Sequence, residues 1–146
     1  MTNSILNEQN ILLNQAFASK EEAIRETGKL LVERGYVEEA YIDKMLEREA
    51  LTSTYMGNYV AIPHGTEDAK ETVKASGIVI VQVPDGVDFG NGNVVKLLIG
   101  IAGKNNEHIE MLSKIAIVCS KEENVDRIIR ATDKKEILSI FNEVSE

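Results

Sequence analysis

Two almost unbroken apolar runs near the middle of the chain most restrict what it can fold into. Residues 78–83 read IVIVQV, and residues 94–101 read VVKLLIGI. Runs this rich in β-branched residues predict strands buried on both faces, because a strand with one face in water would alternate apolar and polar residues. A sheet built from such strands needs a covering layer on each side.

Turn signals and one short apolar segment complete the predicted sheet. Residues 84–86, Pro-Asp-Gly, are expected to end the first strand in a turn, and Asn91-Gly92 marks a second turn before the next strand. Residues 59–62, YVAI, form a further short strand candidate. The central part of the chain is therefore predicted to be a sheet.

Helical periodicity before these strands supplies one set of covering elements. Ser19 and Glu22 have the spacing of a capping box at the start of a helix, and Gly35 is placed to end that helix. A second helix is expected from near Val37, with Arg48 in its last turn.

Three more helices are predicted after the strands. The first follows Asn105-Asn106 and reaches Cys119, the second follows a capping box at residues 120–123, and the third begins at Asp133. No linker or internal repeat interrupts the pattern. We therefore expect one α/β domain over residues 1–146, with a mixed central sheet flanked by helices on both faces.

The composition narrows the class of protein. A chain of 146 residues that is 43% hydrophobic can bury a core of its own. Its formal net charge of −8 argues against a nucleic-acid partner, which would need clustered basic side chains. The single cysteine excludes an internal disulfide and favours a reducing compartment. With no signal peptide or membrane-spanning run in sight, we expect a cytoplasmic protein that reaches a membrane only through a partner.

His64 is the first candidate for chemistry. It follows the short strand candidate and stands between Pro63, which fixes its own φ, and Gly65, which can adopt backbone angles closed to other residues. If one ring nitrogen donates its proton to a backbone carbonyl, for which a tight turn after Pro63 is a source, the other nitrogen is left as a nucleophile. The alternative is a histidine in an ordinary turn.

Arg48 and His108 are the next candidates. Arg48 is either a solvated helix end beside two glutamates or a guanidinium fork for phosphoryl oxygens. His108 stands near the start of a helix, where it is either a surface or capping residue or a neighbour of a bound anion. Residues 52–54, Thr-Ser-Thr, place hydroxyls shortly before His64 and are also good strand formers.

Other common kinds of site have little support. Two histidines 44 positions apart and one cysteine in an apolar stripe lack the close ligand pairs of a zinc site, so Cys119 is expected in the core. The Gly-x-Ser-x-Gly elbow of a serine hydrolase and the phosphate-binding Gly-Lys-Ser/Thr loop are both missing. We expect no metal, no nucleotide and no other cofactor.

Several of these motifs together resemble one known family. Arg48, the segment STYMGN at residues 53–58, the segment AIPHG at residues 61–65, and His108 are similar to the enzyme IIA component of the mannitol/fructose class of the bacterial phosphoenolpyruvate-dependent sugar phosphotransferase system, with the mannitol type most alike. The likeness runs from about residue 12 to residue 141. One departure is Tyr59, where many members carry glycine; its bulk is expected next to the site.

The resemblance implies a phosphoryl carrier. The residue matching His64 would accept a phosphoryl group from phospho-HPr and pass it to a cysteine of the mannitol enzyme IIB. The residues matching Arg48 and His108 would line the same site. Such a transfer passes through a loose transition state with charge on the phosphoryl oxygens, so it needs positioning and positive charge rather than a metal.

The sequence leaves three other interpretations open. The chain could be a regulatory enzyme IIA of the nitrogen-related branch, whose phosphorylation state controls its binding to other proteins. It could serve fructose in place of mannitol, because the membrane subunit mainly selects the sugar. It could also be a plain structural domain.

Overall fold

The computed structural model describes residues 6–104 and 107–145, with the backbone alone for Glu67, His108 and residues 142–145. In chain order its elements are η1 (Glu8–Asn10), β1 (Ile11–Leu12), α2 (Lys20–Glu33), α3 (Ala40–Leu51), β2 (Tyr55–Gly57), β3 (Val60–Ala61), η2 (Glu67–Thr72), β4 (Gly77–Asp88), β5 (Val94–Ala102), α4 (Glu107–Cys119), α5 (Glu122–Arg130) and α6 (Lys134–Ser145). Among the described residues, no helix is both long and apolar enough to cross a bilayer.

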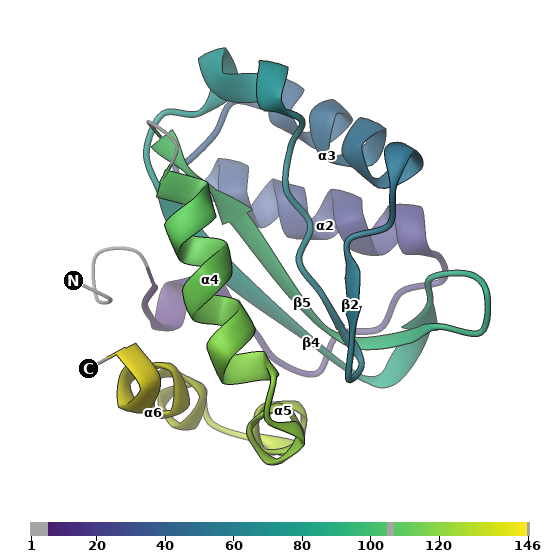
Figure 1. Cartoon of the computed structure of the whole chain (residues 1–146), viewed down its shortest axis with the longest axis vertical. Coiled ribbons are helices and arrows are strands. Elements are labelled where there is room, and N and C mark those ends of the chain that lie inside the picture. The colour runs from purple at the N-terminus through teal and green to yellow at the C-terminus, as the bar shows by residue number, and fades with distance from the viewer. Residues whose placement is uncertain (1–5, 105–106, 146) are drawn as a thin grey trace.

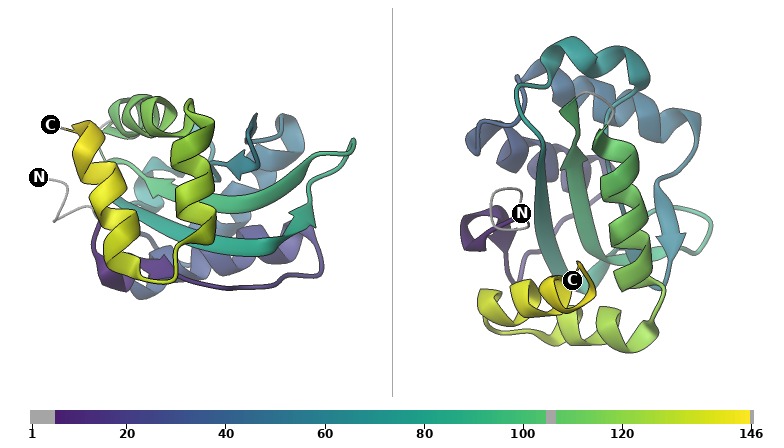
Figure 2. Two further views of the ribbon diagram at one scale, coloured as in Figure 1. Left: turned by 90° about the horizontal axis from the view of Figure 1, so that it is seen from below. Right: turned by 60° about the vertical axis from the view of Figure 1, so that its left-hand side comes forward.

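The strands form one mixed sheet in the order β1-β4-β5-β3-β2 (Figure 1). The long strands β4 and β5 are antiparallel neighbours in the centre, whereas β1 on β4 and β3 on β5 are parallel pairs. Helices α2 and α3 lie on one face, and α4, α5 and α6 lie on the other (Figure 2). The predicted fold class, a mixed sheet covered on both faces, is confirmed.

The two apolar runs explain why both faces need cover. Ile78 and Ile80 of β4 point into the core beneath α4 to α6, while Val79 and Val81 point into the core beneath α2 and α3. All four side chains are buried. Because successive residues of a strand face opposite sides, an unbroken apolar run places hydrophobic side chains in both cores.

Several predicted boundaries are also confirmed. The Ser19 side chain accepts a hydrogen bond from the Glu22 amide, and Gly35 has a φ of +80° just beyond α2. The hairpin between β4 and β5 contains Asn91 and Gly92, both with positive φ. The Asp133 side chain accepts a hydrogen bond from the Lys135 amide at the start of α6. Local signals of this kind work because the interaction partners are close in sequence.

Other predicted boundaries are wrong. β4 does not end at Pro84, because residues 84–86 form an irregularity in its pairing with β5 and the strand continues to Asp88. The expected capping box at residues 120–123 is absent; Lys121 is the N-cap of α5 and makes no side-chain capping hydrogen bond. The second helix begins at Ala40, since Val37 instead pairs with Val73 as a β-bridge. The expected start at Asn105-Asn106 lies outside the described residues.

Cys119 is a core residue, as predicted. Its side chain is 2% exposed, and burial raises the pKa of the thiol to about 12. At pH 8 about one thiol in 10,000 is then ionised, and the thiolate is the reactive form. We expect a disulfide reagent such as Ellman's to titrate Cys119 within minutes in denaturant but only over hours in the native protein. Rapid reaction of the folded chain would contradict this burial.

Candidate functional site

The backbone that leads into His64 is bonded to the sheet before Pro63 and at the Pro63 carbonyl. β3 pairs Val60 with Leu97 of β5, and the Ile101 amide of β5 donates to the Pro63 carbonyl at 3.1 Å. The central strand β5 therefore fixes the backbone that leads into the half-buried His64 side chain. The predicted strand at residues 59–62 is shorter than expected, because Tyr59 has a φ of +67° and belongs to the turn before β3.

One backbone carbonyl determines the tautomer of His64. Its Nδ1 lies 2.8 Å from the carbonyl oxygen of Ile62. A carbonyl can only accept, so Nδ1 carries the proton and Nε2 carries the lone pair of the neutral ring. The acceptor belongs to the residue before Pro63. The prediction that a turn after Pro63 supplies this carbonyl is therefore wrong.

Tyr41 ties the residue after His64 to the sheet. Its buried hydroxyl donates to the Ile101 carbonyl at 2.9 Å and accepts from the Gly65 amide at 2.8 Å. Burial raises the pKa of Tyr41, and the bond from Gly65 opposes the rise. A Cβ on Gly65 would lie 2.6 Å from the Tyr41 ring, and Gly65 is not among the glycines with positive φ. The glycine is therefore required by close packing, not by unusual backbone angles.

Arg48 and His64 line the same cavity. Arg48 lies in the last turn of α3, and its Nη1 donates to the Thr52 carbonyl at 2.6 Å, just beyond the helix end. The cavity has a volume of about 610 Å³. Its lining comprises Tyr41, Glu47, Arg48, Leu51, His64, Gly65, Thr66, Asp68, Ala69, Lys70, Val73, Gly103, Ile109 and Leu112. The site thus brings together an imidazole and a guanidinium that are sixteen positions apart in sequence.

One lysine pairs with both carboxylates at this cavity. Lys44 Nζ lies 3.2 Å from Asp68 and 3.4 Å from Glu47. A hydrogen bond from Thr66 and the contact with Lys44 hold the pKa of Asp68 below its ordinary value, and Asp68 in turn raises the pKa of Lys44. With both carboxylates paired to Lys44, the positive charge of Arg48 is available to an anion in the cavity.

A second and larger cavity, of about 1210 Å³, lies beside α5. Tyr59 lines it, with its ring 4.8 Å below Lys96 Nζ, and does not line the cavity of His64. The expectation that Tyr59 adds bulk next to the site is therefore wrong. The polar side chains of the larger cavity are amides, carboxylates, cations and hydroxyls without an imidazole, so we take the smaller one as the candidate site.

The remaining predicted residues have separate outcomes. The side chain of His108 lies outside the described part of the structure, although its neighbour Ile109 lines the cavity. The Thr54 hydroxyl donates to Glu49, and the Ser53 hydroxyl accepts from the Tyr55 amide. Of the residues described here, no three His, Cys, Asp or Glu side chains form a group that could hold a metal ion.

Sequence reasoning missed the functional neighbours that act through long-range contacts. Tyr41 falls within the helix expected from near Val37 and is not among the candidate residues of the sequence analysis, yet its hydroxyl contacts the residue after His64. No sequence signal marks that contact, because it joins residues 24 positions apart.

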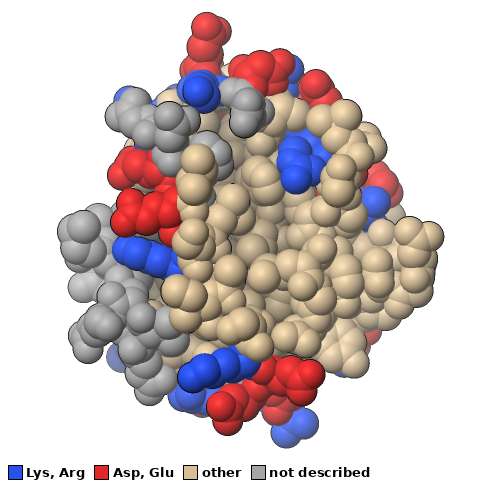
Figure 3. Space-filling view, viewed as in Figure 1, with Lys and Arg blue, Asp and Glu red and all other residues tan. Residues whose placement is uncertain are grey.

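The face around the site is largely uncharged. Between α4 and β2, uncharged side chains cover most of the surface, and charged side chains of both signs gather around it (Figure 3). Leu51 and Ile109, which line the His64 cavity, are 73% and 62% exposed, and large hydrophobic side chains are also exposed on α4 and β2, at Ile117 by 57% and Met56 by 41%. An exposed apolar face on a chain with a net charge of −8 is typical of a protein-docking surface.

Known proteins are similar to this chain in both sequence and fold. Residues 4–144 match the family model described as "Phosphoenolpyruvate-dependent sugar phosphotransferase system, EIIA 2". The mannitol-specific phosphotransferase enzyme IIA component of Geobacillus stearothermophilus is 68% identical over 145 residues, covering 99% of this chain and all of that protein. The Bacillus subtilis protein of the same name is 56% identical, covering 97% of this chain and 99% of its own.

A solved structure extends the likeness to three dimensions. The enzyme IIAMTL in a complex with phosphorylated enzyme IIBMTL from Escherichia coli superimposes with a TM-score of 0.90 at 41% identity, covering 94% of this chain and 97% of that one. Sequence and fold therefore agree across almost the full length. The chain belongs to the EIIA 2 family of the phosphoenolpyruvate-dependent sugar phosphotransferase system.

Proposed function

We propose that this protein carries a phosphoryl group on Nε2 of His64, between phospho-HPr and the enzyme IIB of a mannitol transporter. One observation carries the proposal: the Ile62 carbonyl holds the proton on Nδ1, so the lone pair of Nε2 belongs to a side chain that lines a cavity with Arg48. A neutral imidazole in that tautomer needs no separate base to become a nucleophile.

The proposed reaction consists of two matched displacements. In the first, Nε2 of His64 attacks the phosphorus of the donor phosphohistidine; the new P–N bond forms as the donor P–N bond breaks. In the second, a cysteine thiolate of the acceptor attacks the same phosphorus, a P–S bond forms, and the electron pair returns to Nε2. The Nδ1 proton stays on His64 in both steps, so the phosphorylated ring is a cation, and the leaving ring of each step, protonated on its other nitrogen, departs as a neutral imidazole; neither step requires a metal or an oxidant.

Arg48 supplies the positive charge that the transition state requires. Its guanidinium presents donors in a planar fork that matches two phosphoryl oxygens. The hydrogen bond to the Thr52 carbonyl uses one nitrogen, Nη1, and holds the fork at the cavity without neutralising it. His108 is proposed as a second group beside the phosphoryl oxygens, because α4 contributes Ile109 and Leu112 to the same cavity.

The choice of mannitol and of the protein partners rests on the relatives. The 68%-identical relative is named for mannitol, and the E. coli structure of similar fold contains phosphorylated enzyme IIBMTL. We propose that donor and acceptor dock on the apolar face formed by Leu51, Met56, Ile109 and Ile117. A surface without paired charges suits two successive partners that must each bind and leave.

A reconstituted relay tests this proposal. The purified chain is incubated with ³²P-phosphoenolpyruvate, enzyme I and HPr, and the label on the protein is measured before and after addition of mannitol enzyme IIB. We expect one acid-labile phosphoryl group per chain, which the enzyme IIB removes. A chain that stays unlabelled overturns the carrier role; a labelled chain that mannitol enzyme IIB cannot discharge overturns the mannitol assignment alone.

A further inference from the structure

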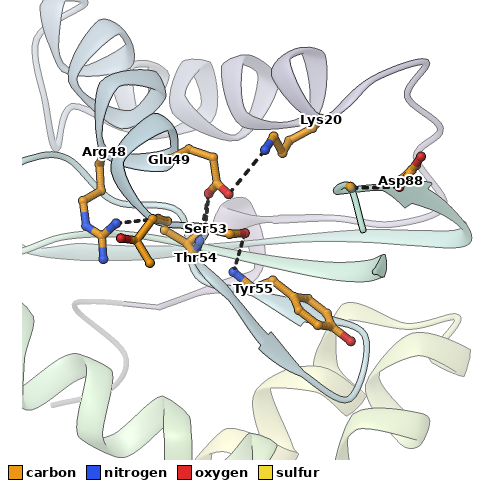
Figure 4. A network of polar contacts seen from close by, with 9 residues as sticks. Lys20, Arg48, Glu49, Ser53, Thr54, Tyr55 and Asp88 are labelled. Carbon is orange, nitrogen blue, oxygen red and sulfur yellow. Dashed lines mark hydrogen bonds and ion pairs between the residues drawn. The ribbon is translucent and has the colours of Figure 1, made fainter. Parts of the chain in front are cut away.

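A buried carboxylate beside the site has no part in the chemistry described so far. Glu49 is only 6% exposed, in the last turn of α3. Its Oε1 accepts hydrogen bonds from the Thr54 amide at 3.0 Å and from the Thr54 hydroxyl at 2.6 Å. Within the described residues Oε2 has no hydrogen-bond partner, and its nearest cation is Lys20 Nζ at 3.7 Å (Figure 4).

The burial of the Glu49 carboxylate with only one oxygen hydrogen-bonded costs folding free energy. Removing a carboxylate from water is costly, and an oxygen without a hydrogen bond recovers only part of that cost. A buried ion pair is often no more stabilising than apolar residues of the same volume. Stability alone therefore gives a weak reason for a glutamate at position 49, and its contacts suggest a role in positioning.

The contacts of Thr54 lead to the site in two directions. Toward α3, the two hydrogen bonds from Thr54 to Glu49, here called the clamp, tie the segment 52–54 to the helix. The Thr52 carbonyl of that segment accepts a hydrogen bond from Nη1 of Arg48. Toward β3, the Thr54 carbonyl accepts from the Ile62 amide at 3.1 Å, and the Ile62 carbonyl accepts from His64. In Figure 4, Glu49 and Arg48 reach opposite ends of this one segment from neighbouring positions in the helix.

We propose that Glu49 is a positioning residue for phosphoryl transfer: through its two bonds to Thr54 it fixes the segment 52–54, whose carbonyl orients the guanidinium of Arg48. This inference rests on the proposed function of the site. The effect falls mainly on Arg48, because the His64 segment has independent supports in β5 and Tyr41. The clamp is placed immediately after the helix end, where the last carbonyls and the chain direction are otherwise weakly determined.

Substitutions at Thr54 test the clamp without removing the buried charge. Thr54→Val keeps the shape but loses the hydroxyl that bonds Glu49, and Thr54→Ser keeps it. Ser53→Ala is a matched control, since it removes a neighbouring hydroxyl whose hydrogen bond among the described residues is with the Tyr55 amide, within its own turn. The rate of label uptake from phospho-HPr is measured by rapid quench, and folding by urea titration, so that every rate refers to folded protein.

We expect Thr54→Val to slow uptake about tenfold, within the roughly 100-fold that a 1 Å misplacement can cost. Thr54→Ser and Ser53→Ala should stay within about twofold of the unmodified chain. In an Arg48→Ala background, Thr54→Val should slow uptake further by less than about twofold. Independent effects would add to within about this factor, so the loss of the tenfold effect would show that Thr54 acts through Arg48. A merely structural role would lower the free energy of unfolding in both backgrounds and leave both rates unchanged.

A second measurement does not depend on the reaction. We expect ¹⁵N relaxation of the Arg48 Nε–H to show a less ordered guanidinium in Thr54→Val than in Ser53→Ala. Equal order, or an equal loss of rate with and without Arg48, overturns the positioning role while leaving the carrier function intact. An unmodified chain that takes up no label overturns the proposed function itself, and the positioning role with it.

Discussion

A His64→Gln variant is expected to take up no phosphoryl group from phospho-HPr. Glutamine matches the imidazole in size and polarity, but its amide nitrogen has no lone pair that can attack phosphorus. The remaining cavity, with Arg48 in place, can bind the donor but lacks the nitrogen that we propose forms the P–N bond. The measurement is the acid-labile ³²P on the chain after incubation with phosphoenolpyruvate, enzyme I and HPr, where we expect background counts only.

Two controls separate this loss of label from misfolding and from a second acceptor. His64 is half-buried and its Nδ1 donates to a backbone carbonyl, so loss of that bond should change the free energy of unfolding by about 1 kcal/mol, the typical net value of such a bond. His108→Gln should still reach full labelling at the end point, because it leaves Nε2 of His64 unchanged. Normal labelling of folded His64→Gln would show that another residue is the acceptor.

The central sheet could be predicted because its signal is local and dense. Residues 78–83 are almost all β-branched, and any sheet that contains them needs cover on both faces. The same reasoning fails at Pro84, since a proline and a glycine can mark either a turn or a bulge within a strand. Only the partner strand decides between these outcomes; here Val87 and Asp88 resume the pairing with β5.

The candidate site could be predicted in its reactive groups but not in their supports. Pro63, His64 and Gly65 are adjacent, so the chain itself displays that motif. Tyr41 and Glu49 look like ordinary members of a helix, one apolar and one charged, until the fold brings Tyr41 to Gly65 and Glu49 to Thr54. Supporting contacts of this kind depend on tertiary packing, and no spacing rule in a single sequence encodes them.

Gly65 illustrates how a correct residue can be given the wrong reason. The sequence suggests backbone freedom, whereas the structure shows a lack of space, with the Tyr41 ring where a Cβ would lie. The two explanations differ in consequence. A glycine required by packing couples its position to one neighbour, so the tyrosine hydroxyl and the missing Cβ together define where the residue after His64 can lie.

An Arg48→Ala variant is expected to slow phosphoryl uptake about 100-fold, similar to the loss of one preorganised donor at other sites where charge develops. The reason is that Arg48 is a cation lining the His64 cavity, held there through the Thr52 carbonyl at 2.6 Å. The variant keeps the nucleophile, so labelling should still reach completion at long times. Rapid-quench measurement of the first turnover separates this slow approach from the absent label of His64→Gln.

Arg48→Lys distinguishes charge from geometry in the same assay. Lysine retains the positive charge but presents a point charge in place of a planar fork, and cannot donate to Thr52 and to two phosphoryl oxygens in the same arrangement. We therefore expect a rate between those of Arg48→Ala and the unmodified chain, with a free energy of unfolding that differs by about 1 kcal/mol or less from either. A first-turnover rate in Arg48→Ala equal to that of the unmodified chain would show that Arg48 is a solvated residue at a helix end. An equal rate in Arg48→Lys would show that the planar fork of the guanidinium is not used.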